Sequence, residues 1–288
     1  MKYIKLLFLS LAMAFGVAML TGCVQQKPEK EFVIYDSLFY PGKPDLSADG
    51  LQKIKLIYES HLLTDGLIDM DKINARIKEA NEAGIKTIST DIESWYWGGK
   101  YSSSYVKDSL TRVFNAFREG IPGASVGNYG VPLGTLNIAR YVEHNAGKSD
   151  EEILSLLMST NNRLEAGEVS DVLYPSLYIY GPDVEQWIAD LKTTVDYAKT
   201  HYPDKKIVGY IWPQYYDWKT NPNYMQFISE EKFLQMLEAA YEHLDGVVLW
   251  AHGRDTDNKT KVNWEDERVQ GIYRAIKTFV ANHNLDRQ

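Results

Sequence analysis

The chain has 288 residues, with 31 Lys and Arg against 39 Asp and Glu and a formal net charge of −8 at pH 7. An acidic chain without a basic stripe argues against a nucleic-acid partner and against a polyanion groove over a whole face, while a local basic patch is compatible with it. Aromatic residues are frequent, with 20 Tyr and 7 Trp, and their positions are more informative than their number.

The N-terminus has the composition of an export signal. Two lysines precede an uncharged apolar stretch, 6–20, that is short for a membrane span. It ends in Leu20-Thr21-Gly22-Cys23, which resembles a bacterial lipobox, and Cys23 is the only cysteine, so it has no disulfide partner. We expect a lipoprotein signal peptide over 1–22, lipidation of Cys23 and a flexible tether over 23–31. The alternatives are a plain signal peptide with an incidental cysteine and an uncleaved anchor.

The remaining residues, 32–288, have the length of one barrel domain. Apolar runs that fit strands alternate with amphipathic segments that fit helices. The expected strands are 32–39, 54–58, 86–92, 124–129, 172–180, 206–212 and 246–250. The expected helices are 68–83, 105–119, 184–200, 230–244 and 265–282, with two more in 136–168. This alternation predicts an α/β fold, a TIM-like (β/α) barrel of seven to eight units with its active site at the C-terminal strand ends.

Two carboxylates stand at the end of the third expected strand. Residues two apart share a face of a strand, so Asp91 and Glu93 point to one side, about 6–7 Å apart at Cα. Both cannot ionise readily in a dry pocket, so one pKa is raised and a general acid results. Glu93 is the expected acid because it lies nearer the barrel mouth. The alternative is an ion pair with a buried Arg or Lys, but no Arg or Lys lies at an expected strand end on the face that the two carboxylates share.

The same alternation places aromatic and polar residues on the inner face of three later strands. They are Tyr174, Ser176, Tyr178, Tyr180, Tyr210, Trp212, Gln214, Trp250 and His252. Five tryptophans lie at or just after strand ends: Trp95, Trp97, Trp212, Trp218 and Trp250. Tyr and Trp offer flat apolar faces with a hydrogen-bonding edge, which suits a sugar ring. The alternative is that these aromatic side chains only cap the barrel core.

Glycoside hydrolysis normally uses two carboxyl groups on opposite sides of the scissile bond, whereas Asp91 and Glu93 lie on the same side. Two solutions stay open. A carboxylate from another strand end could attack or activate water, and Asp36, Glu59 and Asp217 are the candidates. Otherwise the 2-acetamido oxygen of the substrate attacks while Asp91 holds and polarises the amide.

Four segments, in order along the chain, resemble motifs of the hyaluronidases, glycoside hydrolase family fifty-six. Asp91-Ile92-Glu93 before a Trp is similar to their Asp-Trp-Glu-Glu-Trp, and Gly127-Asn128-Tyr129-Gly130-Val131-Pro132 to their Gly-Tyr-Tyr-x-x-Pro. Leu173-Tyr174-Pro175-Ser176-Leu177-Tyr178 resembles Leu-x-Pro-Ser-x-Tyr, and Gly246-Val247-Val248-Leu249-Trp250 resembles Gly-Val-x-x-Trp-Gly-Ser, with Ala251-His252 in place of Gly-Ser. The resemblance implies a seven-unit barrel, Glu93 as proton donor, Asp91 as the acetamido-positioning group, and Tyr129, Tyr178 and Trp250 as substrate contacts.

These observations predict an exported, lipid-anchored glycoside hydrolase of the bacterial cell envelope, held in the outer membrane, which cleaves an oligo- or polysaccharide with retention and needs no cofactor. A neutral or N-acetylated glycan is at least as well supported as hyaluronan. The expected substrate contacts are Trp95, Trp97, Asn128, Tyr129, Tyr178, Tyr180, Tyr210, Trp212, Gln214, Trp250 and His252. Two alternatives remain. One is a non-catalytic glycan-binding lipoprotein on a barrel scaffold, and the other is a metal-dependent hydrolase using His61 and His252, although no paired His motif is present.

Overall fold

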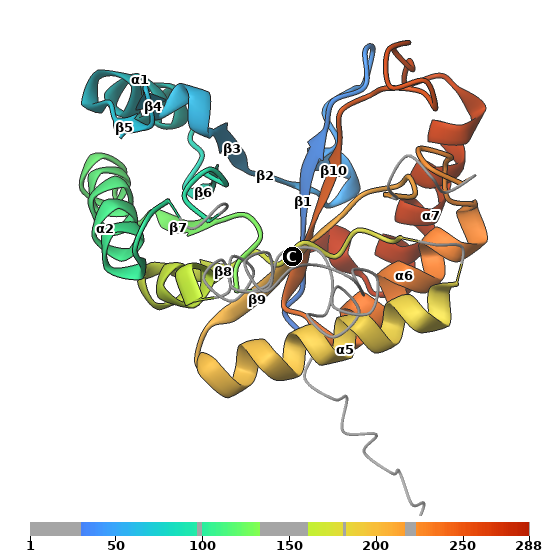
Figure 1. Ribbon diagram of the computed structural model, residues 1–288. Helices are drawn as coiled ribbons and strands as arrows, with labels where there is room; N and C mark the ends of the chain where they lie inside the picture. The colour runs from blue at the N-terminus through green and yellow to red at the C-terminus, as the bar shows by residue number, and fades with distance from the viewer. Residues whose placement is uncertain (1–29, 97–99, 133–160, 181–182, 217–222, 288) are drawn as a thin grey trace, which may run out of the picture. The chain divides into compact units, whose positions relative to one another are not determined.

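Parallel strands form the centre of the computed structural model (Figure 1), which describes residues 30–96, 100–132, 161–180, 183–216 and 223–287. The expected signal peptide, Cys23 and most of the expected tether lie outside the described residues. Phe32–Gln288 form one compact unit, distinct from Met1–Glu31. In the described part of the chain, no helix is long and apolar enough to cross a membrane.

Each expected strand is present in the order that the sequence predicts. The strands are β1 (Val33–Leu38), β3 (Lys55–Tyr58), β6 (Thr87–Asp91), β7 (Ser125–Asn128), β8 (Val172–Leu173), β9 (Lys206–Ile211) and β10 (Gly246–Ala251). The expected strand 172–180 was too long, because Pro175 has no N–H to donate to a ladder. In the rest of the expected strand, residues 174–180, the pairing is limited to two isolated parallel bridges, from Tyr174 to Tyr129 and from Ser176 to Tyr210.

The strand pairings follow the order of a barrel without one continuous ladder around it. One sheet has the order β2-β1-β10-β9-β8 and a second has the order β3-β6-β7. The short β2 (Gln52–Lys53) and β3 are separated by Ile54 alone, so a single chain segment pairs with β1 at its start and with β6 at its end. On the opposite side, the bridge between Tyr129 and Tyr174 connects β7 to the segment after β8.

Five helices begin and end within two residues of the expected positions. They are α1 (Met70–Glu82), α2 (Ser103–Gly120), α5 (Val184–His201), α6 (Glu230–His243) and α7 (Glu267–Asn282). Each starts after a Ser or Asp whose side chain accepts a hydrogen bond from a backbone N–H of the first turn, which stabilises the helix start. Residues 161–169 are also helical, within the segment 136–168 expected to hold two helices, and 133–160 lies outside the described residues.

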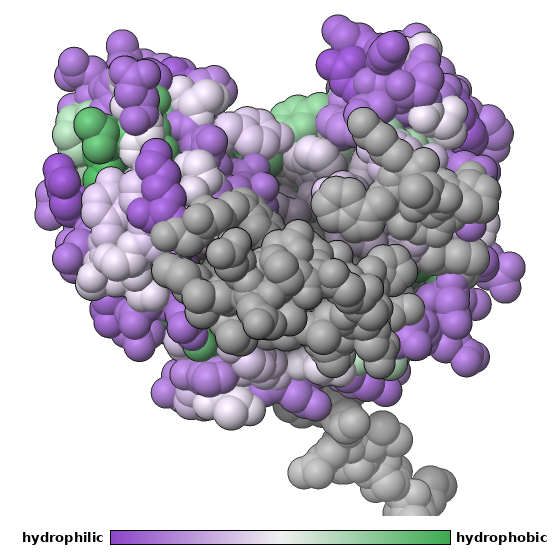
Figure 2. All heavy atoms as spheres, in the orientation of Figure 1, coloured by the Kyte–Doolittle hydropathy of each residue, from purple (hydrophilic) through white to green (hydrophobic). Residues whose placement is uncertain are grey.

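Short elements complete the chain. They are the 3-10 turns η1 (Ser47–Asp49), η2 (Glu59–His61) and η3 (Leu285–Arg287), and a hairpin of β4 (Leu63–Thr64) and β5 (Leu67–Ile68). On the face shown in Figure 2, the described residues at the surface are mostly hydrophilic.

The two faces of the strands differ as the alternation predicts. Ile57, Ile88 and Val126 are completely buried. On the inner face, the Tyr210 hydroxyl donates a 2.7 Å hydrogen bond to Ser89 Oγ, which joins β9 to β6 across the barrel. Gly127 permits a close approach here, since a Cβ atom at this position would lie 2.2 Å from the carbonyl oxygen of Val172. The interior is thus aromatic and polar, and it leads toward the C-terminal strand ends.

Candidate active site

A cavity of about 280 Å³ lies at the C-terminal ends of the strands. Both carboxylates, Asp91 and Glu93, line it. The aromatic side chains that line it with them come from β9, β10 and the segments after the strands: Tyr129, Tyr178, Tyr210, Trp212, Tyr216, Tyr224, Trp250 and His252. The structure therefore brings together two expected catalytic residues and six expected substrate contacts.

The carboxylate pair is held in an environment that opposes ionisation. Burial, together with the neighbouring charges of Glu93 and Glu59, raises the pKa of Asp91 to about 7. Burial also raises the pKa of Glu93. Asp91 Oδ1 is buried with no hydrogen-bond partner in the described part of the protein. The pair can therefore hold a proton near neutral pH and keeps one acceptor atom for a ligand.

A third carboxylate lies near the pair. Glu59 directly follows β3, and its Oε2 accepts a 3.1 Å hydrogen bond from the backbone N–H of Ser94. Its negative charge raises the pKa values of both Asp91 and Glu93. Asp36, the other described candidate for a second catalytic carboxylate, forms an ion pair with Lys43 and does not line the cavity. Asp217 lies outside the described residues.

A buried cation that the strand pattern did not predict also acts on the pair. Arg163 comes from helix 161–169, and its guanidinium lies 4.6 Å from the ring centroid of Tyr96 and donates a hydrogen bond to the Gly130 carbonyl. Its charge lowers the pKa values of both Asp91 and Glu93, against the effect of burial. The alternation of side chains predicts only which residues at the strand ends face the carboxylates. Arg163 lies in the connection between β7 and β8, so this pattern did not predict it.

The aromatic side chains form a continuous wall. Tyr178 stacks on Trp250 with ring centroids 5.7 Å apart and an interplanar angle of 22°. Trp212 meets Trp250 edge to face at 5.5 Å. The indole N–H of Trp250 donates to the Tyr58 hydroxyl, whereas Trp212 Nε1 is buried without a hydrogen-bond partner among the described residues. An unpartnered donor and an unpartnered acceptor, Asp91 Oδ1, thus belong to residues that line one cavity, where a polar ligand can satisfy both.

Four expected substrate contacts do not line this cavity. Asn128 is completely buried, and its side chain bonds to Thr90, to the backbone of Ile92 and to the Tyr96 hydroxyl. Trp95 is completely buried, and Tyr180 stacks edge to face on Tyr216. Gln214 donates to the carbonyls of Met225 and Arg254. The side chains of Asn128 and Gln214 thus bond within the protein, and neither they nor Trp95 line the cavity in the described structure. Trp97 and Trp218 lie outside the described residues.

The structure adds residues that sequence patterning missed. Tyr216, Tyr224 and Asn258 come from the segments after β9 and β10, where no strand or helix period predicts which way a side chain points. Leu56 lies in β3 and would have been found by applying the alternation test to that strand. Asn258 has a φ of +54°, a left-handed conformation that Asn tolerates better than most residues.

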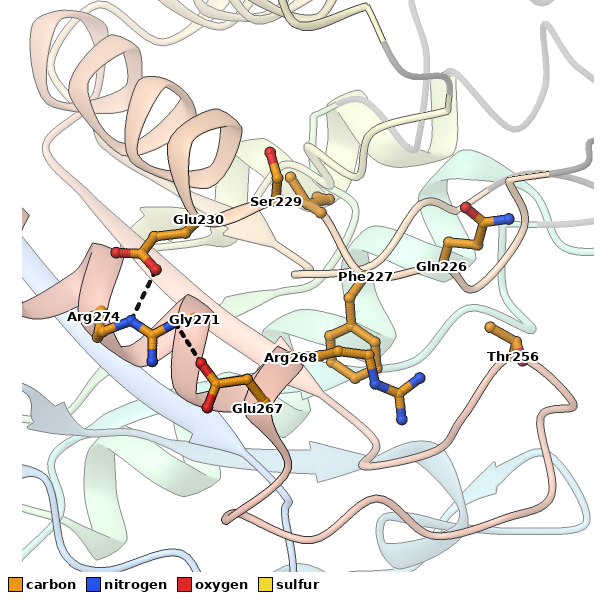
Figure 3. A pocket seen from close by; sticks show the side chains of 10 residues that line it. Gln226, Phe227, Ser229, Glu230, Thr256, Glu267, Arg268, Gly271 and Arg274 are labelled. Atoms are coloured by element: carbon orange, nitrogen blue, oxygen red, sulfur yellow. Dashed lines mark hydrogen bonds and ion pairs between the residues drawn. The ribbon is translucent and has the colours of Figure 1, made fainter.

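A second large cavity, of about 460 Å³, lies between the starts of α6 and α7 (Figure 3). Its charged side chains are paired: Arg274 bonds to Glu230 and Glu267, and Arg268 bonds to Asp255 and Asp266. This pairing leaves no described charge there available for chemistry. Among the described residues, no group of three or more His, Cys, Asp and Glu side chains is placed to hold a metal ion.

Comparisons with solved structures agree with this architecture. Bee venom hyaluronidase superimposes with a TM-score of 0.53 at 13% identity, over 90% of this chain and 100% of that chain. Its complex with a hyaluronic acid tetramer gives 0.52 and 14%, over 88% and 98%. An endo-β-1,4-mannanase from Thermotoga petrophila gives 0.43 and 10%, over 89% and 77%. No protein-family profile and no curated protein sequence matches the chain.

The similarity to bee venom hyaluronidase, at 13% and 14% identity, establishes the fold alone. The protein is a TIM-like (β/α) barrel, with its candidate site at the C-terminal strand ends.

Proposed function

We propose that the protein is a retaining glycoside hydrolase for glycans that contain N-acetylated sugars. The observation that carries the proposal is the carboxylate pair Asp91 and Glu93, with raised pKa values, in a cavity walled by aromatic rings. A carboxyl group that holds its proton near neutral pH can protonate a leaving oxygen, and the rings offer apolar faces to the sugar. In this proposal the proton that the pair holds reaches the leaving oxygen from Glu93, which lies nearer the barrel mouth, and Asp91 is the ionised partner at that stage.

The role of Asp91 follows from its unpartnered oxygen. An acetamido N–H is a donor that can satisfy Asp91 Oδ1, and this contact would hold the acetamido oxygen toward the anomeric carbon. The bond from that oxygen to the anomeric carbon then forms as the bond to the leaving oxygen breaks, while Glu93 delivers its proton to the leaving oxygen. Water later opens the cyclic intermediate, with Glu93 as the base, and the product keeps the configuration of the substrate.

A product analysis tests this function. N-acetylchitohexaose and a hyaluronan hexasaccharide carry the acetamido group, and a mannohexaose lacks it. We expect at least one of the first two to be cleaved and the third to be untouched. Proton NMR during the first turnovers should show product with the anomeric configuration of the substrate. An inverted first product, or equal cleavage of the mannohexaose, would contradict the mechanism.

We also propose that the mature protein is a lipoprotein that begins at Cys23, because the segment Leu20-Thr21-Gly22 precedes the single cysteine. Replacing Cys23 by Ser removes the thiol that accepts the lipid. In bacterial cells, Cys23→Ser protein should leave the membrane fraction or accumulate as the unprocessed precursor, as judged by fractionation and mass. Normal processing together with unchanged membrane partition would end the lipoprotein proposal.

A further inference from the structure

A third cavity adjoins the candidate active site. It measures about 380 Å³ and is lined by Phe39, Tyr40, Pro41, Gly253, Arg254 and Lys261, together with His252. His252 also lines the cavity of the carboxylate pair, so the two cavities share one side chain. A chain molecule that fills the first cavity therefore has a neighbouring space on the other side of the His252 ring.

The His252 side chain is set to donate a hydrogen bond. Its Nδ1 accepts a 3.3 Å hydrogen bond from the backbone N–H of Arg254, so the neutral ring carries its proton on Nε2. Burial, together with the Arg254 charge, lowers the pKa of His252 to about 4, which keeps the ring neutral at pH 7. The Trp212 and Trp250 rings contact it at centroid distances of 5.1 and 5.4 Å and fix its orientation. Within the described structure Nε2–H has no protein acceptor, which leaves it available to a ligand oxygen.

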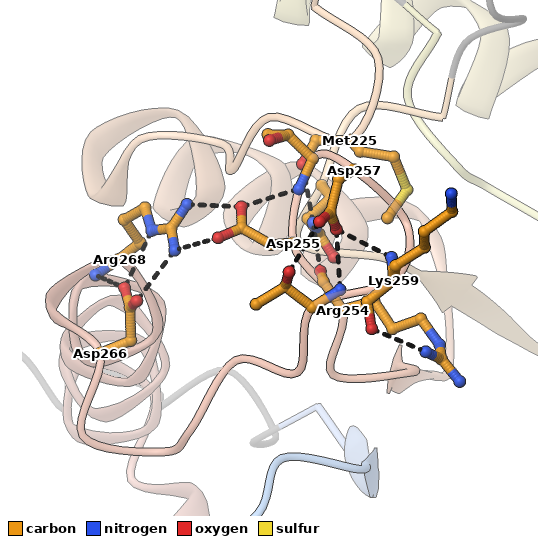
Figure 4. A network of polar contacts seen from close by, with 10 residues as sticks. Met225, Arg254, Asp255, Asp257, Lys259, Asp266 and Arg268 are labelled. Atoms are coloured by element: carbon orange, nitrogen blue, oxygen red, sulfur yellow. Dashed lines mark hydrogen bonds and ion pairs between the residues drawn. The ribbon is translucent and has the colours of Figure 1, made fainter.

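A network of hydrogen bonds and ion pairs holds the segment after His252 (Figure 4). Arg254 and Lys261 form an antiparallel bridge, and Asp257 accepts hydrogen bonds from the backbone N–H groups of Lys259 and Thr260. Asp255, in turn, is held by two hydrogen bonds from Arg268. Segment 254–261 contributes Asn258 to the cavity of the carboxylates and Arg254 and Lys261 to the adjoining one. It is thus preorganised to contact a ligand that occupies both.

The opposite wall of the adjoining cavity is also fixed. Gly253 has a φ of +65°, and a Cβ atom there would lie 2.3 Å from the Phe39 carbonyl oxygen, so the two segments are in direct contact. The Phe39 N–H donates to the Ala251 carbonyl, which extends the pairing of β1 with β10. The Phe39 side chain nevertheless remains 53% exposed. An exposed aromatic ring on a fixed backbone is the kind of surface on which a sugar ring stacks.

The charge of the adjoining cavity is opposite to that of the chain as a whole. Of the side chains that line it, Arg254 and Lys261 are cationic and none is acidic, whereas the chain carries a net charge of −8. Segment 254–261 also contains Asp255 and Asp257, but Asp255 is paired with Arg268 and Asp257 accepts from the backbone. This local excess of positive charge favours an anionic group on the bound ring.

We propose that the substrate cleft continues past His252 into the cavity lined by Phe39, Arg254 and Lys261, which binds a further sugar ring bearing an anionic group, a carboxylate or a sulfate. Phe39 stacks on the ring, the His252 Nε2–H donates to an oxygen at the boundary, and Lys261 and Arg254 contact the anion. The subsite deepens the proposed glycosidase function, on which its role in turnover rests.

Binding measurements test the subsite separately from catalysis. Calorimetric titration of the full-length Glu93→Gln protein, with Phe39→Ala or Lys261→Ala added, compares disaccharides with hexasaccharides. The hexasaccharides are N-acetylchitohexaose, which is neutral, a hyaluronan hexasaccharide, which carries carboxylates, and a chondroitin sulfate hexasaccharide, which carries both anions. Leu67→Ala and Lys78→Ala are matched controls, because Leu67 is 64% exposed, the Lys78 side chain is 76% exposed and neither lines the two cavities.

We expect Phe39→Ala to weaken hexasaccharide binding about ten-fold and to leave disaccharide binding unchanged, since a disaccharide fits the first cavity alone. Lys261→Ala should weaken the binding of anionic hexasaccharides several-fold more than that of N-acetylchitohexaose. A loss with chondroitin sulfate but not with hyaluronan assigns the anion as sulfate, and a loss with both assigns it as carboxylate.

Three results would overturn the subsite. In the first, hexasaccharides bind no more tightly than disaccharides. In the second, Phe39→Ala weakens hexasaccharide binding no more than Leu67→Ala does. In the third, Lys261→Ala weakens the binding of neutral and anionic hexasaccharides equally. Length-dependent binding that depends on Phe39 and Lys261, with no hydrolysis by the wild-type protein, would support the subsite and refute the proposed hydrolase activity. The two proposals can therefore fail separately.

Discussion

Glu93→Gln protein is expected to hydrolyse an unactivated glycoside about 10²–10⁴-fold more slowly than the wild type, which is the usual magnitude for a general acid. The amide is nearly isosteric with the acid but has no proton to give to the leaving oxygen. Binding of the substrate should be nearly intact, so the loss should appear in kcat and not in KM.

A substrate with a strongly activated leaving group distinguishes an acid from a residue that only shapes the site. Such a leaving group departs without a proton, so the Glu93→Gln defect should shrink on a dinitrophenyl glycoside. Tyr216→Phe, which changes an aromatic residue of the same cavity without touching the carboxylates, is the matched control. If the Glu93→Gln defect were the same on activated and unactivated substrates, another group would be the acid.

Asp91→Asn is expected to reduce turnover by about 10²-fold or more, because the carboxylate that orients and polarises the acetamido group is lost. In the same mechanism, a thiazoline that mimics the cyclic intermediate should inhibit the wild-type protein, and the Asp91→Asn protein should bind it more weakly. Inhibition constants for the two proteins provide the measurement.

The competing mechanism gives Glu59 the essential role, since it is the third described carboxylate whose charge reaches the pair. Under substrate assistance, Glu59→Gln should change kcat less than about ten-fold, because Glu59 affects the pair only through its charge. A Glu59→Gln defect as large as that of Glu93→Gln, or a sugar trapped covalently on any carboxylate, would refute substrate assistance.

The stability of the Asp91→Asn protein provides the folding control. Folding raises the Asp91 pKa from 3.8 to about 7. Below pH 4 Asp91 is protonated in the folded protein and does not lower the stability of the wild type, whereas the wild type loses stability as the pH rises toward 7. Asparagine carries no charge and escapes this loss. Asp91→Asn should therefore be more stable than the wild type by about 2 to 4 kcal/mol above pH 7, with little difference at pH 4. Thermal unfolding at the two pH values checks this, and the inactive variant cannot then be dismissed as unfolded.

The alternation of side chains along the strands predicted much of the fold and of the cavity. Asp91, Glu93, Tyr210, Trp212 and Trp250 could all be placed correctly, because the two-residue period of a strand is a local property that does not depend on tertiary contacts. The helices were predictable for a similar reason, since the spacing of their apolar residues and their capping residues are also local features of the sequence.

The alternation of side chains did not predict positions after the end of a strand, and it did not predict how deeply a side chain is buried. The backbone N–H of Tyr96 bonds to the Glu93 carbonyl, so a turn follows the strand and its alternation does not extend to Trp95. Asn128 and Gln214 lie deeper in the structure, where backbone groups and other side chains satisfy their amides. Arg163 and Tyr224 come from connections, and only the folded chain shows that these connections return to the strand ends.

The position of Arg163 also means that the acidity of the carboxylate pair depends on a residue outside the strands. Segments outside the strands help to hold its helix, 161–169: Asn162 donates to the carbonyls of Trp95 and Tyr101, and Lys205 donates to the Gly167 carbonyl. The charge that offsets the burial of the carboxylate pair is thus supplied by the connection between β7 and β8. A substitution at Arg163 would therefore change the acidity of Asp91 and Glu93 while the strands that hold them stay the same.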